Sequence, residues 1–377
     1  MSDSSITLYT LLFIIGSYFA FKSQRRAFYG TNNIRLIWFI ASYLVLWFFF
    51  AFNDVGADTP QYRVLFEYSD SNEMNYYTGA VEPGYIFVNY LVHFLTHNPI
   101  WGVAIIRTIQ ITIVFLSIYL LRNRIIIGFA VMGYMALYYF GSFNILRLAL
   151  ASSICMLCYA CVVNRYNKFI IVILALLPFF IHRSSLVFPL TILLFLIYGK
   201  FQRRYGKFIR ILIVTGCIIV ISLVSVILQD ILSMGFGEGR YDAYLDTNGS
   251  AGVMVFVFYV PLIYCILKSG KEGVEYDANW VNLSFIFTII GFSIAIMGYQ
   301  VGMLARMAPY FAMPMLFYMS NYLISVRSGK YITGLRSNFN YQQGAFLLFF
   351  YYFIRFVINI RGSYIPDGLM GFKFVFN

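Results

Sequence analysis

The stretch FIIVILALLPFFIHRSSLVFPLTILLFLIY, residues 169–198, decides the fold. It is apolar almost throughout, and its one polar break is HRSS at 182–185. This pattern predicts a hairpin of two membrane helices whose turn carries a histidine and an arginine. Each arm has only about 13 residues and rises roughly 20 Å, which is short of the ~30 Å hydrocarbon core. We therefore expect the turn to lie below the outer membrane surface, in a polar recess.

Apolar segments of this kind recur along the whole chain. The 377 residues are 61% hydrophobic and 11% charged, with a mean hydropathy of +0.76, which excludes a soluble domain. The sequence predicts an all-α polytopic membrane protein, a single transmembrane domain over residues 1–377 with about 12 transmembrane helices. The predicted spans are 6–21, 36–52, 100–121, 125–141, 145–163, 169–181, 186–198, 209–229, 251–268, 280–298, 307–326 and 342–360.

The 27 Lys and Arg residues indicate the orientation, because cytoplasmic loops carry an excess of these residues. Most of them fall in alternate loops, and most of the 15 acids fall in the others. Both termini and the long loops at 53–99 and 229–250 are therefore predicted to be periplasmic. The segment 82–98 is too short and too polar to span, so we expect an interfacial or re-entrant helix there. The net charge of +12 reflects this topology and does not indicate nucleic acid as a partner.

Five basic residues are predicted at one depth near the outer end of the membrane: Arg107, Arg147, His182, Arg183 and Arg306. Burying a cation costs roughly 2.5–3.5 kcal/mol on insertion scales, so such a residue usually has an anionic partner. One arginine could snorkel to lipid phosphate. Several at one depth favour a shared ligand such as a lipid pyrophosphate, whose oxygens match the planar guanidinium. His182 could transfer a proton near neutral pH or simply form a hydrogen bond in the turn.

The two long outer loops mix acids with Tyr, Gly and Asn, which suits carbohydrate hydroxyls and also suits an ordinary solvated loop. Asp58 and Glu82 are the candidate acid–base residues. Glu82 precedes Pro-Gly at a helix start, where its carboxylate could instead cap free backbone amides. Tyr62, Arg240 and Tyr241 are further candidates for substrate binding. The sequence has no nucleotide-binding glycine motif and no metal-ligand pattern, so we expect neither a cofactor nor a metal.

Four short motifs follow one another along the chain. They are Gly56, Asp58 and Tyr62; Glu82, Pro83, Gly84 and Tyr85; Arg147 opening an Ala- and Ser-rich span; and His182 with Ser184, Ser185 and Leu186. Over about residues 50–200 the chain thereby resembles the EpsG-like branch of the Wzy polysaccharide polymerases, and Arg306 with Tyr310 fits further on. The resemblance implies a GT-C-like, multi-pass protein of the bacterial inner membrane with its active site facing the periplasm.

The resemblance also implies a reaction, the transfer of a growing glycan from undecaprenyl pyrophosphate to a lipid-linked repeat unit. Neither a nucleotide sugar nor a metal is implied, and a chain-length regulator is a further partner to test for. Under this hypothesis the residues that bind pyrophosphate are Arg147, Arg183 and Arg306, joined by Arg107. The residue that deprotonates the acceptor hydroxyl is Asp58, His182 or Glu82.

Other functions remain open at this point. A lipid-linked oligosaccharide flippase or transporter would bind the same lipid, but should show symmetric halves or charges at mid-membrane. An O-antigen ligase would share the lipid donor and differ in the acceptor. A membrane acyltransferase would also place a histidine in an outward recess, and a purely structural subunit would leave the buried cations unexplained.

Overall fold

The computed structural model describes residues 4–24, 34–70, 81–199, 212–217, 219, 252–269, 277–300, 304, 306–328 and 335–376. Within these ranges the backbone forms helices and turns, with two isolated β-bridges in place of any strand. The chain divides into two compact units. The first comprises Met1–Leu186 and Ser320–Asn377, and the second comprises Val187–Met319.

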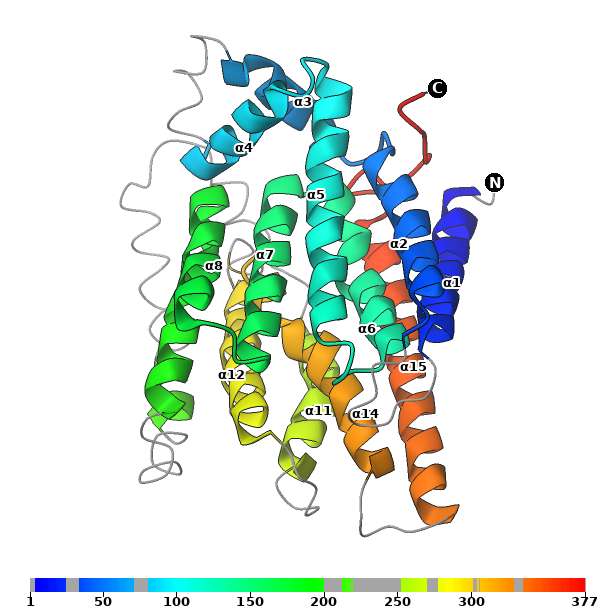
Figure 1. Cartoon of the computed structure of the whole chain (residues 1–377), viewed down its shortest axis with the longest axis vertical. Coiled ribbons are helices and arrows are strands. Elements are labelled where there is room, and N and C mark those ends of the chain that lie inside the picture. The colour runs from blue at the N-terminus through cyan, green and yellow to red at the C-terminus, as the bar shows by residue number, and fades with distance from the viewer. Residues whose placement is uncertain are drawn as a thin grey trace. The chain divides into compact units, whose positions relative to one another are not determined.

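The first unit is a helical bundle in which consecutive long helices pack side by side (Figure 1). Its helices are α1 (Ser4–Ser23), α2 (Leu36–Ala51), α3 (Thr59–Glu67), α4 (Pro83–His93), α5 (Pro99–Leu120), α6 (Ile127–Tyr134) continued by a π-helix (Met135–Tyr139), α7 (Leu146–Val163), α8 (Lys168–Ile181), most of α14 (Met319–Ser328) and α15 (Leu335–Ser363). The closest pairs are α5 with α7, α1 with α2, and α7 with α8. Hydroxyl groups join some of them, since Ser42 on α2 donates to the Gly16 carbonyl on α1 at 2.8 Å.

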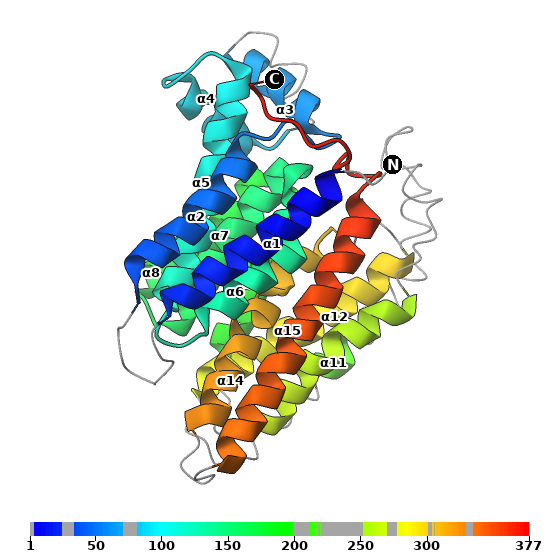
Figure 2. The ribbon, with the colours of Figure 1, turned by 90° about the vertical axis from the view of Figure 1, so that its right-hand side faces the viewer.

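The second unit contains α11 (Gly252–Ser269) and α12 (Ala278–Gln300), which lie side by side (Figure 2). A short 3₁₀-helix (Ala308–Phe311) and a π-helix (Pro314–Tyr318) follow α12. The apolar helix that begins in the first unit as Arg183–Gly199 also enters this unit. Aromatic rings pack in its core, as where the Phe287 and Phe311 centroids lie 5.6 Å apart.

Most of the predicted spans coincide with described helices, but the span at 307–326 is divided between the 3₁₀-helix, the π-helix and α14. Five described helices are long and apolar enough to cross a membrane: Ser4–Ser23, Pro99–Leu120, Leu146–Val163, Ala278–Gly298 and Tyr341–Gly362. Five shorter apolar helices, of 10–17 residues, cover other predicted spans, and the span at 209–229 lies largely outside the described residues. The prediction of an α-helical membrane protein is therefore confirmed. The number of spans and the side on which the termini lie stay predictions.

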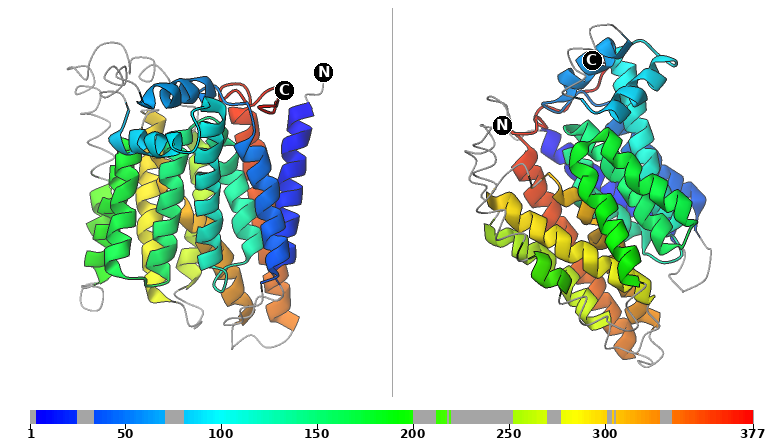
Figure 3. Two further views of the ribbon diagram at one scale, coloured as in Figure 1. Left: turned by 45° about the horizontal axis from the view of Figure 1, so that its top comes forward. Right: turned by 90° about the vertical axis from the view of Figure 1, so that its left-hand side faces the viewer.

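The helices α3 and α4 lie across one end of the first bundle, whereas its other helices run along it (Figure 3). The segment at 82–98 thus contains a short helix, and its position in the membrane interface or as a re-entrant helix stays a prediction. The α8 helix has only 14 residues and ends at His182, beneath α4. The short helix thus places the HRSS turn under a covering helix, and the depth of the turn below the membrane surface stays a prediction.

The segment 364–376 follows α15 and returns to the end of the bundle where α3 lies (Figure 2). It pairs with the loop at 53–58 through backbone hydrogen bonds. The bonds run from Gly56 N to Gly368 O (3.1 Å), from Ala57 N to Asp367 O (3.0 Å) and from Asp54 N to Lys373 O (2.8 Å). Gly56 has a φ of 107°, and a Cβ there would lie 2.5 Å from the Phe143 carbonyl oxygen, so only glycine fits this loop.

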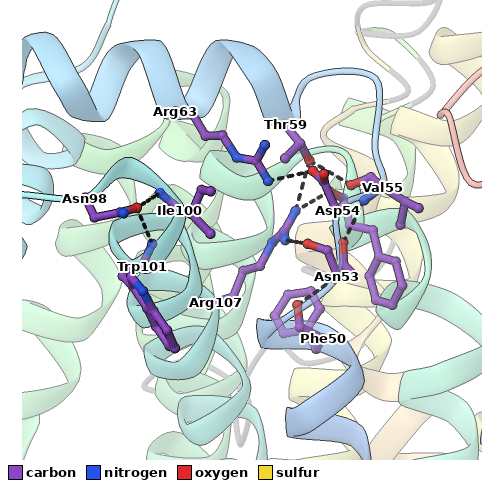
Figure 4. Close-up of polar contacts among 11 residues, drawn as sticks. Phe50, Asn53, Asp54, Val55, Thr59, Arg63, Asn98, Ile100, Trp101 and Arg107 are labelled. Atoms are coloured by element: carbon purple, nitrogen blue, oxygen red, sulfur yellow. Dashed lines mark hydrogen bonds and ion pairs between the residues drawn. The ribbon is translucent and has the colours of Figure 1, made fainter. Parts of the chain in front are cut away.

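Arg107 holds the same loop from inside the bundle (Figure 4). Its side chain is only 1% exposed. It donates to the Asn53 carbonyl (2.8 Å), the Thr59 hydroxyl (3.0 Å) and the Phe143 carbonyl (3.1 Å). These partners are neutral and belong to the protein. We therefore expect Arg107 to stabilise the fold, and this differs from its predicted role as a substrate-binding residue.

Arg107→Ala should lower the free energy of unfolding by at least about 3 kcal/mol, because it removes several buried hydrogen bonds to a charged donor. Arg63→Ala is the matched control. Arg63 pairs with Asp54 at 2.5 Å in a partly exposed position, and such a pair contributes about 1 kcal/mol or less. Thermal unfolding of both variants in detergent measures the difference. Equal melting temperatures would contradict the structural role of Arg107.

Candidate active site

The carboxylate of Glu82 gathers three hydrogen-bond donors at the start of α4. One oxygen accepts from Arg147 Nη1 at 2.6 Å. The other accepts from His182 Nδ1 at 3.0 Å and from the backbone N–H of Arg183 at 3.1 Å. The donors come from the first turn of α7, the residue that ends α8, and the 3₁₀-turn that follows (Arg183–Leu186). We call Glu82, Arg147, His182 and Arg183 the Glu82 cluster.

Glu82 is the residue preceding α4, but it does not cap the helix. Its φ and ψ of −70° and 140° are those of an N-cap, yet its side chain makes no bond to the amides of α4. The expectation that the carboxylate caps these amides is therefore wrong. The carboxylate bonds to Arg147 instead of the α4 amides, because a hydrogen bond between two charged groups is about twice as strong as a neutral one.

Gly84 brings α4 close enough for this contact. A Cβ at Gly84 would lie 2.6 Å from the Phe180 carbonyl oxygen, near the end of α8. Any other residue would therefore push α4 away from α8 and move Glu82 away from His182. Pro83 occupies the first turn of α4, where its missing N–H costs nothing. In the Glu-Pro-Gly sequence, Glu82 thus supplies the anion, Pro83 begins the helix, and Gly84 allows the close contact between α4 and α8.

The environment keeps Glu82 ionised. Burial alone would raise the pKa of its carboxyl group, but the hydrogen bond from His182, the charge of Arg147 and the amide of Arg183 together lower the pKa to about 2. An ionised carboxylate only accepts hydrogen bonds, so His182 Nδ1 carries the proton in this contact, and in the neutral imidazole Nε2 is the acceptor. Glu82 is therefore a weak base, and its carboxylate orients the His182 ring.

Helix α3 brings Tyr62 and Asp58 to the same region. Tyr62 is buried and lies beside Arg147. Burial raises the pKa of Tyr62, the negative charge of Asp58 adds to the rise, and Arg147 opposes it through its charge and hydrogen bonds. Asp58 is half-buried at the start of α3, where its amide donates to the Asn144 side-chain oxygen at 2.7 Å. Tyr62 therefore interacts with the cluster through Arg147, and Asp58 lies within electrostatic reach of Tyr62.

The remaining predicted residues are placed differently. Arg183 contributes its amide to the cluster, while its side chain is exposed. Arg107 is enclosed by protein groups, and Arg306 is an exposed residue of the second unit. Arg240 and Tyr241 lie outside the described residues.

Asn144 and Asp367 are functional candidates that the sequence reasoning did not identify. The Asn144 amide nitrogen lies 3.2 Å from a carboxylate oxygen of Asp367, and its oxygen accepts from the Asp58 amide. Together they link Asp58 to the segment 364–376. The polar break GSFNILR at 141–147 contains Asn144 and is the only sequence signal for it, because its partners lie far away along the chain.

Metal ligands are not grouped in the part of the chain that the structure describes. No three His, Cys, Asp or Glu side chains converge there. Cys155, Cys158 and Cys161 are buried on α7 as free thiols and pack in the bundle. The chemistry that the described side chains offer is anion binding by guanidinium groups and proton transfer by an oriented imidazole.

The comparisons with known proteins agree with these motifs. A family model described as the EpsG family matches residues 36–369, which include the Glu82 cluster and the segment around Asp367. No curated protein and no solved structure matches the chain.

The lowered pKa of Glu82 predicts a pH-dependent stability. The contribution of Glu82 is complete above its unfolded pKa of 4.5 and is lost as the pH falls towards about 2. Between pH 5 and pH 3 the unfolding free energy of the wild type should therefore fall by roughly 2 kcal/mol more than that of Glu82→Gln. Thermal unfolding across this range provides the measurement. Glu67→Gln, which removes an exposed acid on α3, should follow the wild type, and parallel curves for all three proteins would refute the prediction.

Proposed function

The chain belongs to the EpsG family of polymerase-like membrane proteins in polysaccharide biosynthesis, and from this premise we propose that it is a Wzy-type polysaccharide polymerase. The proposed donor is a glycan on undecaprenyl pyrophosphate, and the acceptor is a lipid-linked repeat unit. The reaction would take place at the periplasmic face of the bacterial inner membrane. The observation that carries the proposal is the Glu82 cluster, in which one carboxylate binds the Arg147 guanidinium, the His182 ring and the amide of Arg183.

The reaction breaks the bond between the anomeric carbon of the donor and its pyrophosphate oxygen. A new bond forms from that carbon to the acceptor oxygen, and the acceptor proton passes to a base. Arg147 and Arg183 neutralise the charge that develops on the departing pyrophosphate. Positioned cations of this kind supply a large part of the catalysis in such reactions. Glu82 holds Arg147 in place before the substrate binds. The Arg183 side chain is exposed and can move to contact the pyrophosphate of the substrate.

His182 is the base that the geometry favours. Its Nδ1 is occupied by Glu82, so its Nε2 is the atom that can accept the acceptor proton. The side chain is 21% exposed and remains accessible. Asp58 is the second candidate, since it lies close enough to raise the pKa of Tyr62. Arg306, Arg240 and Tyr241 stay predictions for substrate binding.

An O-antigen ligase would use the same donor, and a flippase would bind the same lipid without reacting. Purified protein, given lipid-linked repeat units alone in EDTA, separates these functions. A polymerase should form longer glycans on the lipid, with no nucleotide sugar or metal added. Activity only when lipid A is supplied would indicate a ligase. Absence of any glycan extension would refute the proposal.

Arg147→Ala should reduce chain extension by about 100-fold or more, because it removes a charged donor from the departing pyrophosphate. His182→Ala should reduce it by roughly 100- to 10,000-fold. Arg122→Ala is the matched control, since Arg122 follows α5 at the opposite end of the bundle and stacks on Tyr119. Gel ladders of lipid-linked glycan give the readout. Normal ladders from Arg147→Ala would contradict the assigned role.

A further inference from the structure

Four polar atoms near the Glu82 cluster are buried without a hydrogen bond. They are the Tyr85 hydroxyl, both amide atoms of Asn89 and the Ser185 hydroxyl. All three side chains are 0% exposed. Nothing in the described ranges donates to or accepts from these atoms. A buried polar atom left unpaired costs about 1–3 kcal/mol, so the unpaired atoms need an explanation.

Tyr85 and Asn89 follow Glu82 along α4, and Ser185 lies in the turn whose first residues contact Glu82. The Tyr85 amide donates to the Glu82 carbonyl at 3.1 Å, and Asn89 lies one turn further along the same side of α4. Ser185 is in the turn that supplies His182 and Arg183, and its amide donates to the His182 carbonyl at 3.0 Å. The Tyr85 ring meets the ring of Tyr62 edge-on, with centroids 6.2 Å apart.

The chemistry of these groups differs from that of the cluster. Hydroxyl and carboxamide groups are neutral, and each can both donate and accept. They match the hydroxyl and acetamido groups of a sugar, whereas Arg147 and Arg183 match phosphate oxygens. Phe, Leu and Ala would fill similar space without any unpaired atom, so packing alone does not account for the polar side chains.

We propose that Tyr85, Asn89 and Ser185 form a carbohydrate subsite beneath α4, which binds the sugar next to the pyrophosphate of the lipid-linked glycan. This proposal rests on the proposed function and assigns the part of the substrate that the arginines do not hold. The three side chains are 0% exposed in this structure, so the glycan enters only when α4 moves away from the bundle, and the contacts of Glu82 with Arg147 and His182 form again once the glycan is bound.

The opposite face of α4 supports this movement within the membrane. Large apolar or aromatic side chains are exposed on this face and in the turn that follows α4: Phe87 (58%), Tyr90 (45%), Leu91 (48%), Phe94 (73%) and Leu95 (74%). A helix with such a face lies in the lipid interface. A lipid-linked glycan in the outer leaflet would therefore meet α4 first, with the polar inner face of the helix behind it.

Buried water is the other possible partner, since water can satisfy such atoms in a polar cavity. The two explanations differ in their consequences. If water satisfies the atoms, Tyr85→Phe leaves glycan binding unchanged. If the glycan satisfies the atoms, Tyr85→Phe keeps or raises the melting temperature and weakens binding of the glycan.

The test compares binding of two probes to the purified full-length protein, by quenching of its intrinsic fluorescence. The probes are undecaprenyl pyrophosphate alone and the same lipid carrying one repeat unit. Tyr85→Phe, Asn89→Leu and Ser185→Ala should each weaken binding of the glycan-bearing lipid by roughly 3- to 10-fold, the effect of one hydrogen bond. Binding of the sugar-free lipid should not change. Arg147→Ala should weaken both.

Tyr90→Phe is the matched control, because Tyr90 lies on the exposed face of α4, and it should bind both lipids normally. Unchanged binding of the glycan-bearing lipid by all three subsite variants would overturn the proposal, and so would equal weakening for both lipids. Asn89→Leu and Ser185→Ala provide independent readings if one variant does not fold. These binding measurements do not depend on polymerisation. They can therefore refute the subsite when polymerase activity is observed, and they can support the subsite when it is not.

Discussion

The carboxylate of Glu82 is the constraint on which the candidate site depends. A buried anion is stable only when it is fully paired, and this one is paired by α7, by the end of α8 and by the turn after it. The pairing fixes Arg147 and the His182 ring in one step. It also anchors α4, because Gly84 lets the helix rest on the backbone of α8. One side chain therefore joins α4, the anion-binding groups and the candidate base.

Two arginines at the same end of the bundle show how similar residues acquire different roles. Arg107 is enclosed and bonds to neutral oxygens of its own chain, which leaves it no accessible surface for a ligand. Arg147 is balanced by a carboxylate and remains 24% exposed. Arg147 is therefore accessible and can bind an anionic ligand in addition to Glu82 or in its place. Arg107 is buried and stabilises the fold.

The sequence predicts the helices well because their signals are local. The helices Leu36–Ala51 and Pro99–Leu120 lie within a residue or so of their predicted spans, and the short arm at Lys168–Ile181 implies its recessed turn. The sequence also indicates Glu82, Arg147 and His182 as candidate site residues, because each lies in one of the motifs that resemble the EpsG-like branch. It could not show the direction in which Glu82 points or the enclosure of Arg107. Both depend on partners from distant segments, such as Phe143 and the turn at 182–183.

The pairing of segment 364–376 with the loop at 53–58 has a consequence for biosynthesis. A chain is made from its N-terminus, and its parts begin to fold as they emerge. The loop that carries Asp58 is therefore inserted long before Asp367 and Gly368 are synthesised to complete its hydrogen bonds. Until then the region around Arg147 lacks its final support. The candidate site would thus lack this support throughout membrane insertion, and the closing of this contact would mark the maturation of the fold.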